Sequence, residues 1–258
     1  MKTTLKFSTL LVALASVFTF SSCLNSNNDS TYPAYASYVT ITGDQFMGYT
    51  FYADFGSILR PTSASVQEVL PGLSTSTVKR AYVAFDLASD TEKGQNLESG
   101  KIYDIILRQS YYANYAIPTY NTIRHTAASD SLITKNKYVQ DVNKDIWAAN
   151  GYVNALITIN YQQNKTFSMN TYYSEEDIDV ANNTLNLNLY YNSNSETPSA
   201  QGQSVFSFRL PEEVIYSNHF STDSITLVLN AISGYDNSQL NKVGECKVAI
   251  KDFSEPMF

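Results

Sequence analysis

The sequence is poor in the residues from which metal sites and disulfide frameworks are built. Its 258 residues include two cysteines, two histidines, ten glycines and seven prolines. So few cysteines and histidines exclude a disulfide-rich scaffold, a zinc ribbon and a site built from a histidine cluster. The low glycine and proline content excludes collagen-like and low-complexity chains. We therefore expect a folded body that carries neither a metal nor a cofactor.

Positive charge is also scarce. The chain has 17 Lys and Arg against 24 Asp and Glu, which gives a net charge of −7, and charged residues make up only 16% of it. Nucleic-acid affinity depends mainly on the neutralisation of phosphates by Lys and Arg, so a nucleic acid is excluded as a partner. What the sequence has instead is aromatic residues, with 20 Tyr, 13 Phe and one Trp.

The N-terminus has the pattern of a secretory signal. Lys2 and Lys6 form a short basic region, an apolar stretch runs from Leu10 to Phe20, and two serines precede Cys23. This order indicates secretion, and the apolar stretch is shorter than the roughly 20 residues of a spanning helix. The cysteine directly after the small pair resembles the lipobox of bacterial lipoproteins. We expect residues 1–22 to be removed and Cys23 to be the site of lipid attachment; the alternative is an ordinary cleaved signal with an incidental cysteine.

A lipid anchor would determine where the protein works. Two or more acyl chains give stable membrane attachment, whereas one chain gives only marginal binding. Residues 23–37 are polar and nearly uncharged, which is typical of a flexible tether. Loss of Lys2 and Lys6 leaves 15 basic against 24 acidic residues, so the mature chain carries −9 and an anionic lipid surface does not attract it. The sequence predicts a cell-envelope location, at the outer membrane, on either its periplasmic or its surface face.

From Tyr38 onward the pattern predicts one strand after another. Apolar residues recur at every second position over Val78–Leu87 in the first half, and over Val153–Ile159 and Leu185–Leu189 in the second. In the second half the opposite positions are mostly Asn and Thr, which is typical of half-buried antiparallel strands in a sandwich. A stretch without periodicity near 121–131 separates the halves. We therefore predict an all-β fold with domains at 38–127 and 128–258, the second an immunoglobulin-like antiparallel β-sandwich.

Short apolar and turn segments follow one another in a particular order after the signal that ends at Cys23. They are Gly56–Pro61, Gly100–Tyr103, Asp145–Trp147, Gly151–Asn154 and Thr222–Leu227. In the order and spacing of these segments the chain resembles the NigD-like family of bacterial lipoproteins. The resemblance implies that residues 38–127 form an OB-like barrel ahead of the β-sandwich domain, and it implies no established chemistry.

Aromatic residues are the candidates for a ligand-facing surface. They are Tyr111, Tyr112, Tyr115, Tyr120 and the single tryptophan, Trp147. A tyrosine combines an apolar face with a hydroxyl group, which suits contact with a glycan or a protein, and a tryptophan can stack on a sugar ring. Each residue also has a structural interpretation: barrel lining and loop packing for the tyrosines, and a core plug for Trp147.

The acidic residues from Glu175 to Asp179 could bind Ca²⁺ but lack the order of a calcium loop, so we interpret them as a solvated turn. His125 and His219 lie in no motif, and the sequence patterns of serine hydrolases, zinc proteases and P-loops are absent. Cys246 alternates in phase with Val248, which predicts a buried structural thiol. We therefore predict that the protein is not an enzyme and that its sites are neither catalytic nor metal-binding.

The sequence thus predicts an envelope lipoprotein, attached to the membrane through its lipid, with a binding or scaffolding role and a protein or glycan partner. Two alternatives stay open. A surface glycan-binding accessory protein is favoured by the aromatic cluster. A pilus or adhesin subunit is favoured by the low charge and by bare strand edges. Thr184–Tyr191 has no charged residue that would protect an edge, although a covered edge is the commoner outcome.

Overall fold

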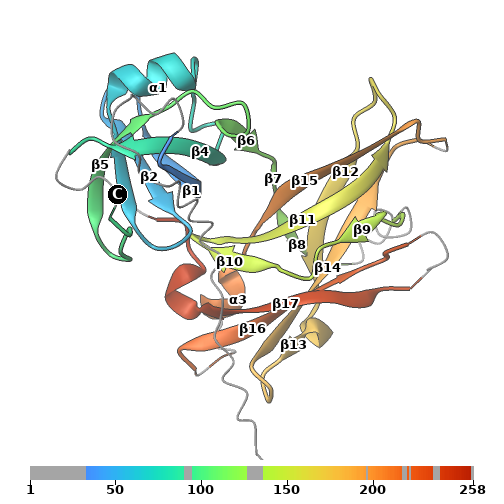
Figure 1. Ribbon diagram of the computed structural model, residues 1–258. Helices are drawn as coiled ribbons and strands as arrows, with labels where there is room; N and C mark the ends of the chain where they lie inside the picture. Colours follow the sequence, from blue (N-terminus) through green and yellow to red (C-terminus); the bar gives the residue numbers. More distant parts are fainter. Residues whose placement is uncertain are drawn as a thin grey trace, which may run out of the picture.

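The computed structural model describes residues 33–89, 95–126, 136–195, 197–216, 220, 222–234 and 239–256. These residues form two β domains joined by one short crossing segment (Figure 1). The expected signal peptide, Cys23 and His219 lie outside the described residues. None of the helices in the described ranges has both the length and the hydropathy to cross a membrane.

The first domain is a five-stranded barrel. Its strands are β1 (Tyr35–Asp44), β2 (Gly48–Ala53), β3 (Ile58–Pro61), β4 (Arg80–Leu87) and β5 (Ile102–Leu107). They pair in the order β1-β2-β3-β5-β4, and β1 also pairs with β4, which closes the barrel. The parallel pair β3–β5 and the position of helix α1 (Ser63–Val69) between β3 and β4 give the topology of an OB fold. The predicted OB-like barrel is thus confirmed.

The predicted alternation fills the barrel. Ala81, Val83, Phe85 and Leu87 all point into the core and are almost completely buried. Because successive strand residues face opposite sides, the even-numbered residues of β4 lie on the outer surface of the barrel. That surface is covered near Arg80, the first residue of β4, because the second domain packs there.

The second domain is a sandwich of two sheets. One sheet contains β10 (Trp147–Ala149), β11 (Tyr152–Tyr161), β15 (Ala200–Arg209) and β7 (Thr119–Tyr120), with β9 (Asp141–Val142) beside β11. The other contains β17 (Asn241–Ala249), β16 (Ser224–Ala231), β14 (Thr184–Asn192), β12 (Ser168–Tyr173) and β8 (Thr122–Arg124), with β13 (Ile178–Asp179) beside β14. Short helical segments are α3 (Glu212–Tyr216), η2 (Glu175–Asp177) and η3 (Ile250–Asp252).

The apolar faces predicted for the second half form the core between the two sheets. Leu185, Leu187, Leu227 and Leu229 are fully buried there, together with Ile157. Most strand pairs are antiparallel, as expected, but β14–β16, β12–β8 and β15–β7 are parallel. Strands β14 and β16 can run parallel because β15 and α3 lie between them in the chain, and β15 crosses to the other sheet.

The domain boundary differs from the expected one. Strand β6 (Tyr115–Ile117) still pairs with β4 of the barrel, whereas β7 already pairs with β15 of the sandwich. The chain therefore crosses at Pro118, ten residues before the boundary predicted at 127/128. Strands as short as β7 and β8 carry too few residues for a period-two signal, so this stretch of sequence resembles a linker.

One further expectation is corrected at the strands, and one open question is decided there. Strand β1 begins at Tyr35, so the last residues assigned to the tether at 23–37 belong to the barrel sheet. The segment Thr184–Tyr191 is not an exposed edge, because β14 pairs with β16 on one side and with β12 on the other. Asparagine side chains of this strand form bonds to the neighbouring strand within the sheet. Asn188, for example, accepts a hydrogen bond from Asn230 of β16 at 3.0 Å.

Gly151 gives a test of how the C-terminal segment is held. Its φ is +84°, and a Cβ atom there would lie 2.6 Å from the backbone nitrogen of Glu255. Gly72 has a similar φ of +74°, and a Cβ atom added to it would have nothing within 4 Å. We expect Gly72→Ala to lower the free energy of unfolding by about 1 kcal/mol, which is the ordinary cost of placing alanine in the left-handed conformation. Gly151→Ala should lower it clearly more. Urea unfolding of both variants checks this, and equal losses would contradict it.

Candidate functional site at the domain interface

A buried ion pair lies where the barrel meets the sandwich. Arg80 at the start of β4 is completely buried, and the side chain of Asp54, just after β2, is 10% exposed. The guanidinium donates to both carboxylate oxygens, with Nη1–Oδ1 at 2.9 Å and Nη2–Oδ2 at 2.6 Å. Nη1 also donates to Thr40 Oγ1 at 2.7 Å, because Thr40 is the cross-strand partner of Arg80. Such two-pronged pairing fixes the guanidinium in a single orientation.

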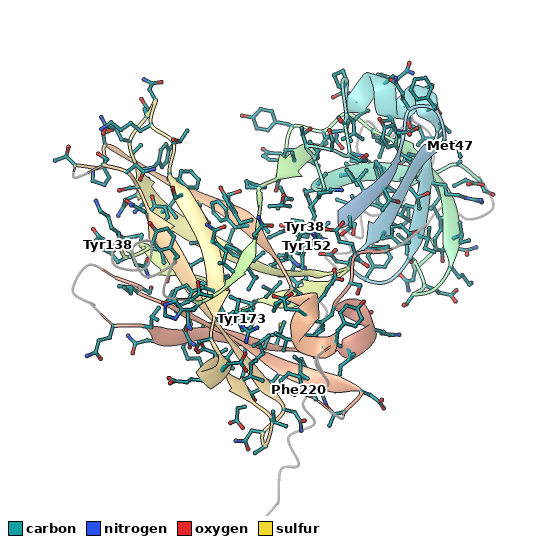
Figure 2. All side chains as sticks on the ribbon, turned by 180° about the vertical axis from the view of Figure 1, so that it is seen from behind. Tyr38, Met47, Tyr138, Tyr152, Tyr173 and Phe220 are labelled. Carbon is teal, nitrogen blue, oxygen red and sulfur yellow. The ribbon has the colours of Figure 1, made fainter. Side chains whose placement is uncertain are left out.

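The sandwich satisfies the rest of this ion pair. Arg80 Nε donates to Ser207 Oγ at 3.1 Å, and the guanidinium carbon lies 5.3 Å from the ring centre of Tyr152. The indole nitrogen of Trp147 donates to Asp54 Oδ2 at 2.7 Å, and Asn150 donates to the carbonyl of Tyr52 at 3.1 Å. Tyr38 of the barrel and Tyr152 of the sandwich both lie at this junction (Figure 2). The two charges of the barrel thus neutralise each other, and uncharged groups of the sandwich supply the remaining hydrogen bonds and the ring contact.

A second set of bonds connects the ion pair to the sandwich strands. Ser207 donates to Asn154 Oδ1 at 2.6 Å, and Asn154 Nδ2 donates to the carbonyl of Trp147 at 3.3 Å. These residues are neighbours because Asn154 pairs with Ser207 on one side and with Trp147 on the other. Asn154 and Ser207 are fully buried. The arrangement orients Trp147 toward Asp54.

Four rings continue from the ion pair toward the surface, and we call them the aromatic ladder: Trp147, Tyr38, Tyr82 and Tyr115. Ring centres are separated by 5.1 Å for Trp147–Tyr38, 4.6 Å for Tyr38–Tyr82 and 5.7 Å for Tyr82–Tyr115. The tyrosines lie on adjacent strands, since Tyr82 pairs with Tyr38 in β1 and with Tyr115 in β6. Burial raises the pKa of all three hydroxyl groups above the ordinary value, so the rings of the ladder stay uncharged even in mildly alkaline solution.

The ladder ends beside an exposed loop of the barrel, residues 108–114, which we call the tyrosine loop. Tyr111 and Tyr112 are 93% and 81% exposed, and their rings meet edge to face with centres 4.9 Å apart. Asn114, in the left-handed conformation with φ of 67°, fastens the loop: its side chain donates to the carbonyl of Arg108 at 2.6 Å and accepts from the amide of Ala84 at 3.0 Å. The loop thus presents two large rings on an anchored backbone.

The structure divides the five aromatic residues singled out in the sequence. Tyr111, Tyr112 and the 42% exposed Tyr115 lie at the exposed end of the ladder. Trp147 is half-buried and bound to Asp54, so it closes the interface. Tyr120 lies in β7 against Phe206 and Phe208 and packs on the sandwich core.

Sequence reasoning missed the ion pair of Arg80 and Asp54. The available signal was Arg80 itself, an arginine at the start of a strongly periodic strand. Its phase places it on the outer face, which would ordinarily be solvated. Only the packing of the second domain turns that position into a buried one.

The remaining polar candidates have structural roles. Asp177 accepts from the amide and hydroxyl of Ser174 in a capping box, and Asp179 accepts from Asn182, which lowers the pKa of Asp179. Burial raises the pKa of the Cys246 thiol to about 12. Within the described ranges no three His, Cys, Asp or Glu side chains come together in a way that could hold a metal ion.

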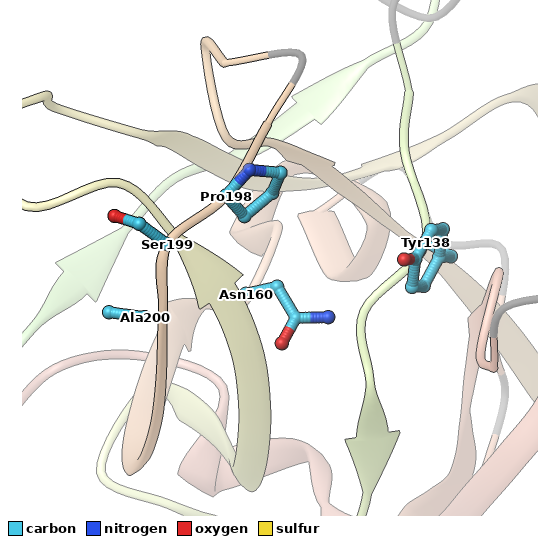
Figure 3. A pocket seen from close by; sticks show the side chains of 5 residues that line it. All are labelled: Tyr138, Asn160, Pro198, Ser199 and Ala200. Carbon is cyan, nitrogen blue, oxygen red and sulfur yellow. The ribbon is translucent and has the colours of Figure 1, made fainter.

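A shallow hollow of about 350 Å³ lies on the outer face of the sandwich, far from the interface (Figure 3). Asn160 forms its floor, between Tyr138 and the segment Pro198–Ala200. The Asn160 amide is already bonded to Gln140 at 3.0 Å and to Gln201 at 3.3 Å. Its hydrogen-bonding groups are therefore partly used within the protein.

The fold and its interface define a two-domain, all-β protein in which an OB-like barrel precedes a β-sandwich. Residues 123–242 match the family described as the NigD-like C-terminal beta sandwich domain. The match covers most of the second domain, and it confirms the resemblance to the NigD-like family. The match begins within β8, after the crossing at Pro118. A search of the curated proteins finds no match.

Several solved structures share the fold of the chain over both domains. One, from Parabacteroides distasonis and described provisionally as toxin-related, has a TM-score of 0.57 at 17% identity, covering 84% of this chain and 94% of that one. A NigD-like immunity protein from Bacteroides caccae has a TM-score of 0.54 at 14% identity, and the match covers 83% of this chain and 96% of that one. A protein from Bacteroides fragilis, described provisionally as a lipoprotein, has a TM-score of 0.51 at 13% identity, and the match covers 84% of this chain and 97% of that one. At these identities the likeness concerns the fold alone.

The ion pair gives the second testable prediction. Arg80→Met leaves Asp54 buried without its counter-charge, which we expect to lower the free energy of unfolding by about 3–5 kcal/mol. The matched control is Arg60→Met, because Arg60 pairs with Asp104 at 3.0 Å with both side chains exposed, and such pairs contribute about 0–1 kcal/mol. Denaturant unfolding of both variants measures the difference. Similar losses in the two would show that the interface does not depend on Arg80.

Proposed function

We propose that this chain is a lipid-anchored envelope protein whose folded body is a non-catalytic binding module with a protein partner. The observation that carries the proposal is the tyrosine loop, on which Tyr111 and Tyr112 are almost fully exposed while the loop itself is fastened by Asn114. Large exposed aromatic rings are uncommon on a solvated surface and are enriched in the contact regions of protein–protein interfaces.

The anchoring of the loop favours binding. Association normally costs about 0.5–1.5 kcal/mol for each mobile side chain that becomes fixed. Tyrosine has few rotatable bonds, and its neighbour and the backbone restrict it further here, since Tyr111 and Tyr112 contact each other edge to face. The loop therefore resembles the rigid, tyrosine-rich contact loops of binding proteins.

The ring geometry favours a protein over a glycan at this site. Tyr111 and Tyr112 are inclined at 84°, and the rings of the aromatic ladder are inclined at 43–44° to their neighbours. A sugar platform would offer exposed coplanar rings, whereas an irregular aromatic surface fits apolar side chains of a partner protein. A protein partner also agrees with the description of one structural neighbour as an immunity protein.

The anchor in this proposal is Cys23, which follows a short apolar signal and a pair of serines. A neighbour described provisionally as a lipoprotein supports this part of the proposal. The tether then connects the lipid to β1 of the barrel, so the tyrosine loop is held near the membrane but free to meet a partner. An outer-membrane location is part of the same proposal.

Binding by the tyrosine loop is tested with a photo-reactive amino acid at Tyr111 in cells, followed by purification of the captured protein. We expect Tyr111→Ala with Tyr112→Ala to weaken binding of that protein at least tenfold without changing the unfolding midpoint, since both side chains are exposed. The control is Phe46→Ala with Met47→Ala, because these residues are 86% and 87% exposed elsewhere on the barrel. An equal loss in the control pair would refute a specific role of the loop.

Anchoring is tested separately. Cys23→Ala removes the only thiol that the lipobox pattern provides, so we expect the full chain to move from the membrane fraction to the soluble envelope fraction. Immunoblots of fractionated cells give the readout. Retention of the variant in the membrane fraction would overturn the lipid anchor and leave the binding proposal standing.

A further inference from the structure

The sheet that contains β11 and β15 carries two rows of polar side chains on its outer face, at the end remote from the barrel (Figure 1). Ile157 and Ile159 of β11 point into the core, so the residues that alternate with them face outward. Pairing with β15 and β9 arranges these outward residues in rows across the sheet. One row consists of Asn160 and Gln201, and the other of Asp141, Thr158 and Gln203.

Hydrogen bonds hold the carboxamide side chains of this face in place. Asn160 Nδ2 donates to Gln140 Oε1 at 3.0 Å, and Asn160 Oδ1 accepts from Gln201 Nε2 at 3.3 Å. Gln203 Nε2 donates to Thr158 Oγ1 at 3.1 Å. A carboxamide has two N–H groups and two lone pairs on its oxygen. These bonds use one of each on Asn160, so its second N–H and its second lone pair can bond a ligand.

The Asn160 side chain is also the floor of the shallow hollow, in which Tyr138 stands on one side and the segment Pro198–Ala200 on the other (Figure 3). The walls therefore combine an aromatic ring, a proline ring and a methyl group with the hydroxyl of Ser199. None of the described residues that line the hollow is charged. Its volume of about 350 Å³ lies at the lower end of the range of small-molecule sites, about 300–1,000 Å³.

We propose that this hollow, together with the adjoining rows, is a binding site for a neutral oligosaccharide. A sugar hydroxyl is both a donor and an acceptor, and the carboxamide of Asn160 offers both at one point. The C–H faces of a sugar ring are apolar and suit the rings of Tyr138 and Pro198. Because Asn160 is held on both sides and lies on a strand, little side-chain freedom is lost when a ligand binds.

The chemistry of the hollow disfavours other classes of ligand. An anion would find no Lys or Arg among the described lining residues, and the chain as a whole is acidic. A hard cation needs several oxygen ligands, and no three acidic side chains come together in the described ranges. Protein interfaces are apolar at their centre, whereas a carboxamide occupies the centre here. A neutral ligand rich in hydroxyl groups is the class that fits these groups.

The second row extends the site beyond a single sugar ring. Positions two residues apart on a strand are separated by about 7 Å. Gln203 and Asp141 are both exposed, so hydroxyl groups of a second ring can bond the Gln203 amide and donate to the Asp141 carboxylate. A ligand of several sugar units therefore uses both rows.

The test is isothermal titration calorimetry of the full chain in a detergent that has no sugar headgroup. The neutral probes are maltohexaose, cellohexaose, xylohexaose and mannohexaose, and hexagalacturonate is their charged counterpart. We expect saturable binding of at least one neutral probe, and at least tenfold weaker binding of hexagalacturonate. The proposal is overturned if no neutral probe binds, or if the charged probe binds equally well.

A change at the floor of the hollow locates the sugar. Asn160→Asp replaces the amide by a carboxylate of the same shape that has no donor, so we expect binding of the neutral probe to weaken at least tenfold. The matched control is Asn170→Asp, because Asn170 is also half-buried and faces outward, from β12 in the other sheet. Unaltered binding by Asn160→Asp, or an equal loss in Asn170→Asp, would overturn the assignment of this site.

A second pair of variants keeps the test decisive if Asn160→Asp does not fold. Gln140→Ala with Gln201→Ala removes both supports of the Asn160 amide, and both side chains are exposed, so we expect a folded protein with at least tenfold weaker binding. Gln45→Ala with Gln67→Ala removes two exposed glutamines of the barrel and should leave binding unchanged. Equal losses in the two pairs would overturn the site. These variants spare the tyrosine loop and the lipid anchor, so their failure would leave the proposed protein partner standing.

Discussion

The relation between the two domains depends on one buried ion pair, Arg80 with Asp54. Both residues come from the barrel, but their desolvation is made tolerable by Trp147, Ser207 and Tyr152 of the sandwich. A buried guanidinium without these groups would be strongly unfavourable. The barrel therefore has a surface that is complete only when the sandwich is docked, and the docking geometry is fixed by directional bonds as well as by apolar contact.

The same constraint positions the candidate binding surface. Trp147 is held by Asp54, Tyr38 packs on Trp147, and Tyr82 and Tyr115 continue the contact to the barrel edge. The tyrosine loop leaves the barrel just before Tyr115. The exposed end of the aromatic ladder, which belongs to the barrel, is thus supported by a residue of the sandwich.

Much of the fold could be predicted from the sequence, and the interface could not. The alternation in β4, β11, β14 and β16 identified the core because each strand has one buried face. The crossing at Pro118 was missed because β7 and β8 are too short to show a period. Arg80 gave no sign of burial, since a charged residue on the outer face of a strand is normally solvated, and only contact between distant segments reverses that expectation. Tyr120 was grouped with Tyr115 for their closeness in sequence, although they lie in different domains.

The parallel pairing of β14 with β16 has a consequence for how the protein matures. The paired residues Thr184 and Thr226 are about 40 positions apart, so this contact has a high sequence separation and forms slowly. During synthesis the barrel segments emerge first and can close, whereas the second sheet must wait for β16 and β17. The nascent sandwich then exposes apolar strands for an interval, and this is the stage at which the chain is most prone to aggregate.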